Sequence, residues 1–209
     1  MGNRNFRSRL ALLYYDFLSR CLEPFAAKLP SPNALTLASL AVSLFSGYAY
    51  ARGWIFTAGL LLLAAGFIDT LDGTIARMHK KVTRFGALLD STVDRYAEWF
   101  VFIGLIIHFR KTWVLFIVLA ALMGSIMVSY VKARAEGLGV TEMGGLMQRP
   151  ERLLLLIAGS LANPVFVMNL AGQPDGILVT VITILAVLGN MTALQRLIDG
   201  RKNLDRLDR

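Results

Sequence analysis

Long apolar stretches separated by short charged segments run through most of this chain, and their lengths are those of membrane-spanning helices. The stretch 34–51 carries no charged residue, and a helix of that length can cross the hydrocarbon core of a bilayer. Asn33 is the predicted N-cap of this helix, and Pro164 is predicted to bend a later one. We predict six spans, at 34–51, from about 53 to 77, in the segment that is apolar from 99 to 107, at 112–131, at 153–172 and at 176–194.

An amphipathic segment precedes the first span. Phe6, Leu10, Leu13 and Phe17 recur at helical spacing, with charged residues between them. This pattern is typical of a helix that lies in the membrane interface, although an amphipathic helix packed on a soluble core would show it too. We therefore predict an N-terminal interfacial helix over about 6–28.

Composition agrees with a membrane protein. Hydrophobic residues make up 56% of the 209 residues, above the roughly 45–50% that is typical of soluble domains. The single cysteine, Cys21, cannot form an internal disulfide. The predicted fold is an all-α integral membrane protein in which the interfacial helix precedes six transmembrane helices at about 33–200, all within a single domain, 1–209.

Basic residues are distributed unevenly between the two ends of the predicted spans. With six spans, 18 of the 22 Lys and Arg residues lie on the side that holds both termini, whereas Arg52, Arg110 and Lys111 lie on the opposite side and Arg95 lies within a span. The positive-inside rule places the termini on the cytoplasmic face of a multi-pass cell-membrane protein. The net charge of +8 comes from residues that flank apolar segments, so anionic lipid and phosphorylated substrates explain it better than nucleic acid.

Four aspartates interrupt the second and third predicted spans. Asp69 and Asp72 are three positions apart and Asp90 and Asp94 are four apart, so on helices each pair projects from one face. Unpaired, four aspartates near a bilayer centre would cost about 10–14 kcal/mol. Clustered carboxylates without His or Cys suit a hard divalent cation, Mg²⁺ or Mn²⁺, and ion pairing with nearby arginines is the alternative.

Small residues accompany these aspartates. Gly73 and Ala76 lie on the face of the first pair, and Gly86 lies one turn before Asp90. The missing side chains would let the phosphates of a bulky ligand approach the backbone. Close packing of transmembrane helices is the alternative explanation.

A second polar group lies at the cytoplasmic ends of the later spans. It includes the segment S-Y-V-K-A-R-A-E and the segment Q-R-P-E-R, and its members are Ser129, Lys132, Arg134, Arg149, Arg152 and Arg196. Cations at helix ends often reach to lipid phosphates. Several guanidinium groups at one membrane depth would instead form a phosphate-binding site.

The aspartate stretch resembles the signature of the CDP-alcohol phosphotransferases (CDP-alcohol phosphatidyltransferases), D-x2-D-G-x2-A-R-x8-G-x3-D-x3-D. The matching residues are Asp69, Asp72, Gly73, Ala76, Arg77, Gly86, Asp90 and Asp94. This resemblance implies a membrane enzyme that transfers a phosphatidyl-type group from a CDP-linked lipid to an alcohol and releases CMP. It also implies two metal ions held by the four aspartates, Asp94 as the general base, and a homodimer.

Within that family, the two basic segments resemble those of prokaryotic phosphatidylinositol-phosphate synthases, so the implied donor is a CDP-diacylglycerol-type lipid and the implied acceptor is myo-inositol phosphate. The implied acceptor-phosphate residues are Ser129, Lys132, Arg134, Arg152 and Arg196. The implied CDP-lipid residues are Asn33, Thr36, Asp69, Gly73, Ala76, Arg77 and Gly86. No role is carried over for residues 162–175.

Other functions remain open on the sequence. The acceptor could be glycerol phosphate or another alcohol, and the donor could be an archaeal diether lipid. A cation transporter would also carry intramembrane aspartates, but these acids gather at one face rather than along a path through the bilayer. A lipid-binding scaffold would not need four metal-ligand carboxylates.

Overall fold

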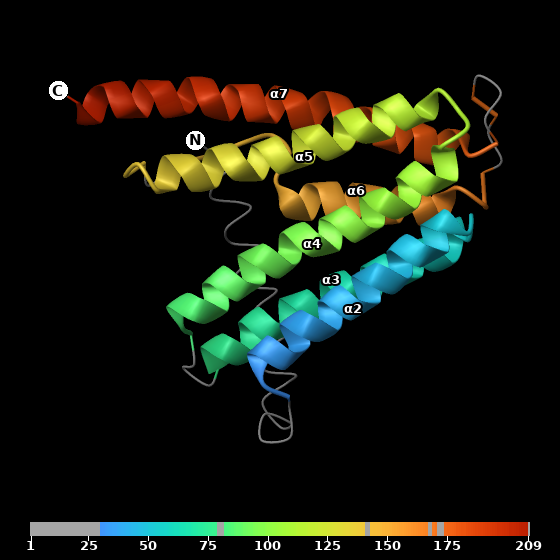
Figure 1. Ribbon diagram of the computed structural model, residues 1–209, viewed down its shortest axis with the longest axis horizontal. Helices are drawn as coiled ribbons and strands as arrows, with labels where there is room; N and C mark the ends of the chain where they lie inside the picture. The colour runs from blue at the N-terminus through green and yellow to red at the C-terminus, as the bar shows by residue number, and fades with distance from the viewer. Residues whose placement is uncertain (1–29, 79–81, 141–142, 167–168, 171–173, 209) are drawn as a thin grey trace. The chain divides into compact units, whose positions relative to one another are not determined.

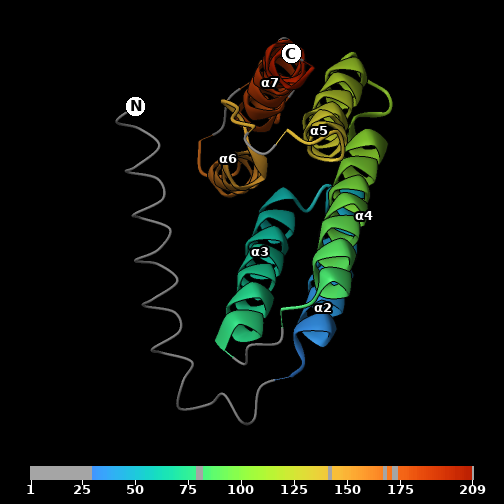
Figure 2. The ribbon, with the colours of Figure 1, turned by 90° about the vertical axis from the view of Figure 1, so that its left-hand side faces the viewer.

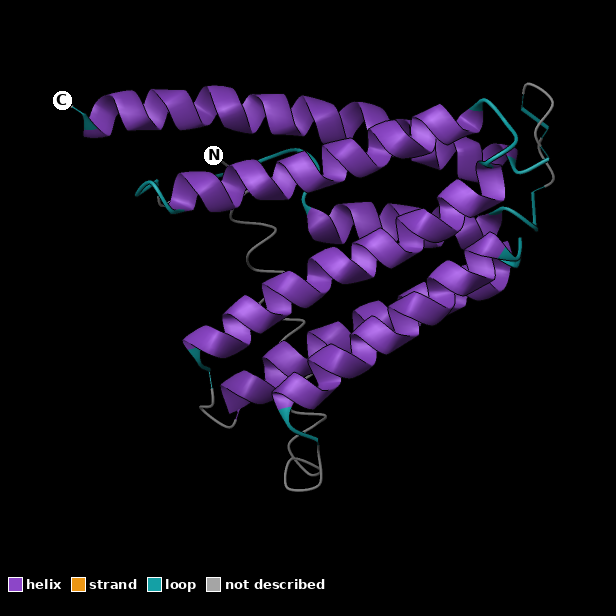
Figure 3. Cartoon of the chain, in the orientation of Figure 1, coloured by secondary structure: helices purple, strands orange, loops and turns teal. Residues whose placement is uncertain are grey.

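The computed structural model describes residues 30–78, 82–140, 143–166, 169–170 and 174–208. Six α-helices and no β-strand occur in these residues (Figures 1 and 3). The all-α prediction is confirmed for this part of the chain, and the predicted interfacial helix at 6–28 lies outside it. The helices are α2 (Pro32–Ala51), α3 (Ile55–Met78), α4 (Arg84–Phe109), α5 (Val114–Glu136), α6 (Arg149–Ala162) and α7 (Gly176–Leu207).

Four of these helices, α2, α3, α5 and α7, are long and apolar enough to cross a membrane. The helix α4 has 26 residues but carries the aspartates and further charges in its first half. The helix α6 has only 14 residues, fewer than the roughly 20 that a perpendicular crossing needs. The apolar helices indicate a multi-pass membrane protein.

Two predicted details are wrong. The fifth predicted span was a single helix bent at Pro164, but α6 ends at Ala162 and the chain turns through the proline. Asn163 still has helical φ and ψ, but Pro164 has no backbone N–H to continue the helical hydrogen bonds, and the Asn163 side chain contacts Asp175 at the start of the next helix. The N-cap of α2 is not Asn33 but Ser31, whose hydroxyl accepts a hydrogen bond from the Ala34 amide at 3.3 Å. Pro32 then occupies the first helical position, which suits its fixed φ.

The last helix is longer than its apolar part. The sixth predicted span ended at residue 194, whereas α7 continues to Leu207. Most residues of the added turns are exposed, although Arg196 and Gly200 are buried, and the turns carry a helical (i, i+4) ion pair in which Arg201 Nε lies 3.9 Å from Asp205 Oδ2. Apolar length therefore marks the membrane-crossing part of this helix and not its end.

Contacts divide the chain into two compact units. Among the described residues, one unit contains those of 30–42 and 64–96, and the other contains those of 43–63 and 97–208. All four motif aspartates belong to the first unit, and the cationic set belongs to the second. In the second unit, α7 packs along α5 and α6 (Figure 2).

The core of the second unit is apolar and closely packed. Leu105, Val118, Leu178 and Ile182 are almost completely buried. The helices α2 and α4 approach closely here, because a Cβ added at Gly104 would lie 2.1 Å from the carbonyl oxygen of Gly47. Only a residue without a side chain leaves room for this approach, so Gly104 permits the short distance between α2 and α4.

Three helix ends in the second unit are joined by a polar clasp of His108, Asn163 and Asp175. His108 Nε2 lies 2.8 Å from Asp175 Oδ2, and Asn163 Nδ2 donates to Asp175 Oδ1 at 2.8 Å. The Leu178 amide donates to Asn163 Oδ1 at 3.1 Å. The clasp thus ties the ends of α4 and α6 to the start of α7. The side chain of Asn163 serves this contact where the chain leaves α6.

We expect the substitution Asp175→Asn to lower the thermal stability of the protein in a pH-dependent way. The hydrogen bond from His108 holds the pKa of Asp175 below its usual range. A carboxyl with a depressed folded-state pKa adds stability above its unfolded pKa of about 3.9 and loses it as the pH falls through the folded value. Loss of a charge-assisted hydrogen bond costs roughly 1.5–3 kcal/mol. Melting of the detergent-solubilised protein should therefore show a lower Tm for the variant at pH 7 and a shrinking difference below about pH 4. Equal Tm values at pH 7 would contradict this role.

Candidate functional site

The motif aspartates lie on two helices. Asp69 and Asp72 lie in the second half of α3, and Asp90 and Asp94 lie in the first half of α4. The start of α4 is set by Thr83, whose hydroxyl accepts a hydrogen bond from the Gly86 amide at 2.9 Å. Thr83 was not among the predicted residues, although a threonine directly before a helix is a standard N-cap signal.

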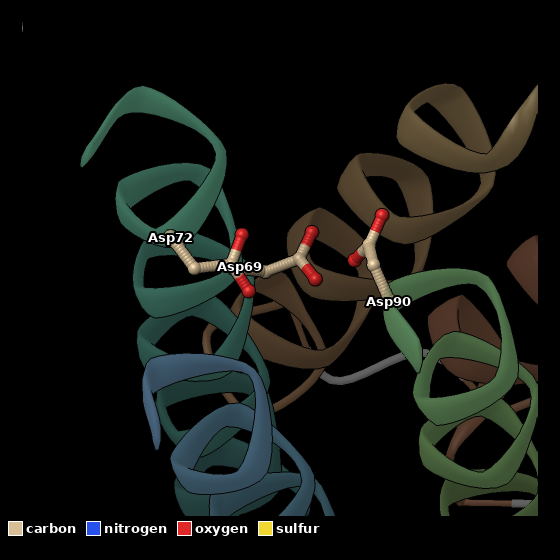
Figure 4. A group of neighbouring side chains, drawn as sticks. All are labelled: Asp69, Asp72 and Asp90. Atoms are coloured by element: carbon tan, nitrogen blue, oxygen red, sulfur yellow. The ribbon is translucent and has the colours of Figure 1, made fainter. Parts of the chain in front are cut away.

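Three of the four aspartates come together. Asp69, Asp72 and Asp90 each offer a carboxylate oxygen, and these atoms all lie within 4.8 Å of one another (Figure 4). Asp72 is buried, with 6% of its surface exposed, and the other two are partly buried. Three converging carboxylates repel one another unless a cation lies among them, and hard oxygen ligands suit Mg²⁺ or Mn²⁺. The donor set therefore fits a divalent metal.

The carboxylate of Asp72 is oriented by α2. The hydroxyl of the buried Thr36 donates a hydrogen bond to Asp72 Oδ2. Hydrogen-bonded ligand carboxylates are characteristic of metal sites, where such partners set the ligand orientation. Thr36, predicted to contact the CDP moiety, thus contacts a predicted metal ligand in this structure.

Asp94 is not one of the three clustered aspartates. It is buried, and its Oδ2 lies 3.9 Å from Nη2 of Arg95. The structure therefore distinguishes Asp94 from Asp69, Asp72 and Asp90. Its roles as a metal ligand and as a base stay predictions.

The remaining predicted CDP-lipid residues belong to the same unit as the aspartates. A Cβ at Gly73 would meet no atom nearer than Arg77 Nη2, at 3.9 Å, so this helix face is open. Arg77 is exposed in the last turn of α3, and Ala76 is partly buried. Asn33 is exposed, and its Oδ1 would lie 3.8 Å from a Cβ at Gly86.

The cationic set divides into buried and exposed members. Arg152 and Arg196 are 5% and 4% exposed, whereas Lys132 and Arg134 are exposed and Ser129 is partly buried. Burial within the protein excludes the lipid-headgroup explanation for the two buried arginines. Lys132 Nζ lies 3.7 Å from Glu136 Oε1 in a surface (i, i+4) pair.

The two buried arginines make ordered contacts. Arg196 donates from Nε to the Gly144 carbonyl at 2.8 Å and from Nη1 to the Val128 carbonyl at 2.6 Å. Arg152 donates from Nη2 to Glu98 Oε1 at 3.1 Å. Glu98 was not among the predicted residues, and its only signal in the sequence is that of a lone glutamate beside the apolar part of α4.

The chain belongs to the CDP-alcohol phosphatidyltransferase family, because the sequence pattern of that family matches residues 29–192. The resemblance inferred from the aspartate signature is confirmed, and the protein is an enzyme of this type.

Curated relatives match most of the chain. An archaetidylinositol phosphate synthase of Methanothermobacter thermautotrophicus is 38% identical over 186 residues, which cover 87% of this chain and 89% of the relative. A phosphatidylinositol phosphate synthase of Mycobacteroides abscessus is 32% identical over 206 residues, which cover 94% of this chain and 91% of the relative.

Solved structures of a similar protein share the fold. The crystal structure of Mycobacterium tuberculosis phosphatidylinositol phosphate synthase with CDP-DAG bound has a TM-score of 0.74 and 30% identity, and the match covers 89% of this chain and 92% of that one. The same enzyme in complex with manganese and citrate also has a TM-score of 0.74, with 29% identity over 88% of this chain and 87% of that one. Manganese in that relative agrees with the divalent metal that the three aspartates fit.

Proposed function

We propose that this enzyme transfers the phosphatidyl group of CDP-diacylglycerol to myo-inositol phosphate, giving phosphatidylinositol phosphate and CMP. The observation that carries the proposal is the cluster of three carboxylates from Asp69, Asp72 and Asp90, all of which belong to the family signature. Relatives named as phosphatidylinositol phosphate synthases, one of them solved with CDP-DAG bound, support both substrates.

The metal centre would hold two divalent cations, Mg²⁺ or Mn²⁺. Asp69, Asp72 and Asp90 would hold them, and Asp94 would complete the ligand set. When bound, such ions neutralise charge on a donor pyrophosphate and on leaving CMP. Thr36 keeps the Asp72 carboxylate in the orientation that this requires.

Asp94 acts as the general base. Its carboxylate takes the proton of the acceptor hydroxyl, whose oxygen forms a bond to the lipid-linked phosphorus while the bond between that phosphorus and CMP breaks. Asp94 lies outside the group of three aspartates whose carboxylate oxygens cluster, which supports a role besides metal binding. The CDP-lipid lies against Asn33, Thr36, Asp69, Gly73, Ala76, Arg77 and Gly86.

The acceptor phosphate binds to the cationic set. Buried Arg152 supports this assignment, because its Nε has no hydrogen-bond acceptor among the residues that the structure describes. A buried guanidinium N–H without an acceptor is costly, and a phosphate oxygen would satisfy it. The full set is Ser129, Lys132, Arg134, Arg152 and Arg196.

Release of CMP by the purified enzyme tests the proposal. Detergent-solubilised protein with Mg²⁺ and CDP-diacylglycerol should release CMP with inositol phosphate and much less with free inositol, serine or glycerol phosphate. A preference for glycerol phosphate would overturn the proposed acceptor and leave the family assignment intact.

A diether lipid is the second candidate donor. The 38% identity to a relative named archaetidylinositol phosphate synthase favours including it. Parallel assays with CDP-diacylglycerol and its diether counterpart should identify the donor as the lipid with the higher kcat/KM. Both lipids contain the same CDP group, so a difference in kcat/KM reports recognition of the lipid part.

For the membrane topology we propose six spans with both termini and the aspartates on the cytoplasmic side, as the distribution of basic residues supports. We expect the variants Lys81→Cys and Gln148→Cys, each made in a Cys21→Ser background, to react with a membrane-impermeant thiol reagent only from the cytoplasm. A cysteine at Gln173 should react only from outside. Labelling of Lys81→Cys from outside would contradict this orientation.

The family resemblance supports a homodimer. Mass measurement of active enzyme in detergent should give twice the chain mass after subtraction of the detergent. A purely monomeric active enzyme would contradict the dimer.

A further inference from the structure

Glu98 connects three helices beside the cationic set. It lies on α4, and only 14% of its side chain is exposed. Its Oε1 accepts a hydrogen bond from the Ser125 hydroxyl of α5 and another from Arg152 Nη2 of α6. A single carboxylate oxygen of Glu98 on α4 therefore contacts both α5 and α6.

The guanidinium of Arg152 is held in one orientation by these contacts. Nη2 pairs with Glu98, and Nη1 donates to the Met147 carbonyl at 3.3 Å, whereas the buried Nε has no acceptor among the described residues. Because a guanidinium is planar, fixing both terminal nitrogens also fixes the direction of the Nε–H bond. The contacts thus leave the Nε–H of a fixed guanidinium for a ligand outside the described protein residues.

A second buried cation lies near Arg152. The guanidinium of Arg196 lies within electrostatic range of Arg152 and is similarly buried. Glu98 pairs with Arg152, and Glu136 and Glu151 act electrostatically on Arg196. These carboxylates leave the Nε–H of Arg152 without an acceptor among the described residues, and an anionic ligand would satisfy it.

We propose that Glu98, held by Ser125, is a positioning residue that orients Arg152 toward the phosphate of the acceptor. This inference rests on the proposed function. Glu98 does not bind the acceptor, because its carboxylate would repel a phosphate. It acts by fixing the guanidinium, so that less orientational freedom is lost when the acceptor binds.

The test is a comparison of Michaelis constants in Glu98→Gln. Glutamine retains the size and an acceptor oxygen but loses the charge, and charge-assisted hydrogen bonds are about twice as strong as neutral ones. We expect the KM for inositol phosphate to rise about 3- to 15-fold, while the KM for CDP-lipid changes less than about twofold. Ser125→Ala should shift the same constant in the same direction by a smaller factor.

Asp175→Asn is the matched control. Asp175 is also a partly buried carboxylate, 20% exposed, that pairs with a side chain from another helix. It lies in the clasp and not in the proposed acceptor site, so its loss should lower Tm and leave the acceptor KM unchanged. If Glu98→Gln lowers Tm in the same way without a change in acceptor KM, Glu98 is only structural and the inference is wrong.

A double-substitution cycle shows whether Glu98 acts through Arg152. In an Arg152→Gln background, Glu98→Gln should raise the acceptor KM by less than about twofold, because no guanidinium remains to be oriented. The full single-variant effect in that background would overturn the inference.

The outcome for the wild type separates this inference from the proposed function. If the wild type uses glycerol phosphate alone, the proposed acceptor is wrong, and the same KM comparison with glycerol phosphate decides the role of Glu98. If it uses only acceptors without a phosphate, both ideas fail.

Discussion

Asp90→Asn will reduce CMP release by about 100-fold or more, because it removes one of three converging charges while nearly keeping the side-chain volume. Groups that stabilise transition-state charge in a preorganised site contribute roughly 10²–10³ in kcat. Asp90 is the α4 member of the carboxylate group, so its loss also breaks the link between α3 and α4 that a shared ion would supply. The measurement is the initial rate of CMP release over a titration of Mg²⁺ or Mn²⁺.

The metal titration distinguishes loss of a ligand from loss of the fold. A variant that lacks a ligand should need a higher metal concentration for half of its residual activity and should keep the Tm of the metal-free wild type. Asp205→Asn, an exposed carboxylate in the last turns of α7, is the control and should retain full activity. Wild-type turnover in Asp90→Asn, or in excess chelator, would contradict the metal centre.

Arg152→Gln will raise the KM for inositol phosphate by about 10- to 150-fold, with much less effect on the KM for CDP-lipid. A charge-assisted hydrogen bond contributes roughly 1.5–3 kcal/mol, which corresponds to that range. Glutamine is preferred to alanine because its amide can still donate to Glu98, and an unpaired buried carboxylate would destabilise the protein by about 3–5 kcal/mol.

The control for this variant is Arg201→Gln, an exposed arginine on α7 that should leave both Michaelis constants unchanged. Arg152→Lys separates charge from shape, because lysine keeps the charge but lacks the planar fork, and it should recover only part of the loss. Unchanged acceptor KM and kcat in Arg152→Gln would remove the case for a phosphorylated acceptor.

Most helix positions could be predicted because apolar length and periodicity are local properties. The start of α7 was predicted at the residue where it is found. The bend at Pro164 was wrong because a proline can either kink a helix or end it. The local sequence does not decide between the two, whereas the contact of Asn163 with Asp175 favours an end at this position.

The metal centre was more predictable than the cationic site. Asp69 and Asp72 share a helical face by spacing alone, and a buried carboxylate in an apolar segment needs a partner. Glu98 and Arg152, by contrast, are 54 positions apart. Glu98 alone is a single charge beside an apolar stretch, and Arg152 alone resembles an ordinary cation near a helix end. Nothing in their local sequence indicates that they pair.

The amino-acid sequence by itself determined which segments are apolar helices and which carboxylates share a face, because helical geometry relates residues three and four positions apart. Only the tertiary structure decided that Asp90 reaches Asp69 and Asp72, that Thr36 holds Asp72, and that Arg152 is buried against Glu98. These contacts depend on how close distant segments approach, which is set by packing such as that of Gly47 against Gly104 and not by any local pattern.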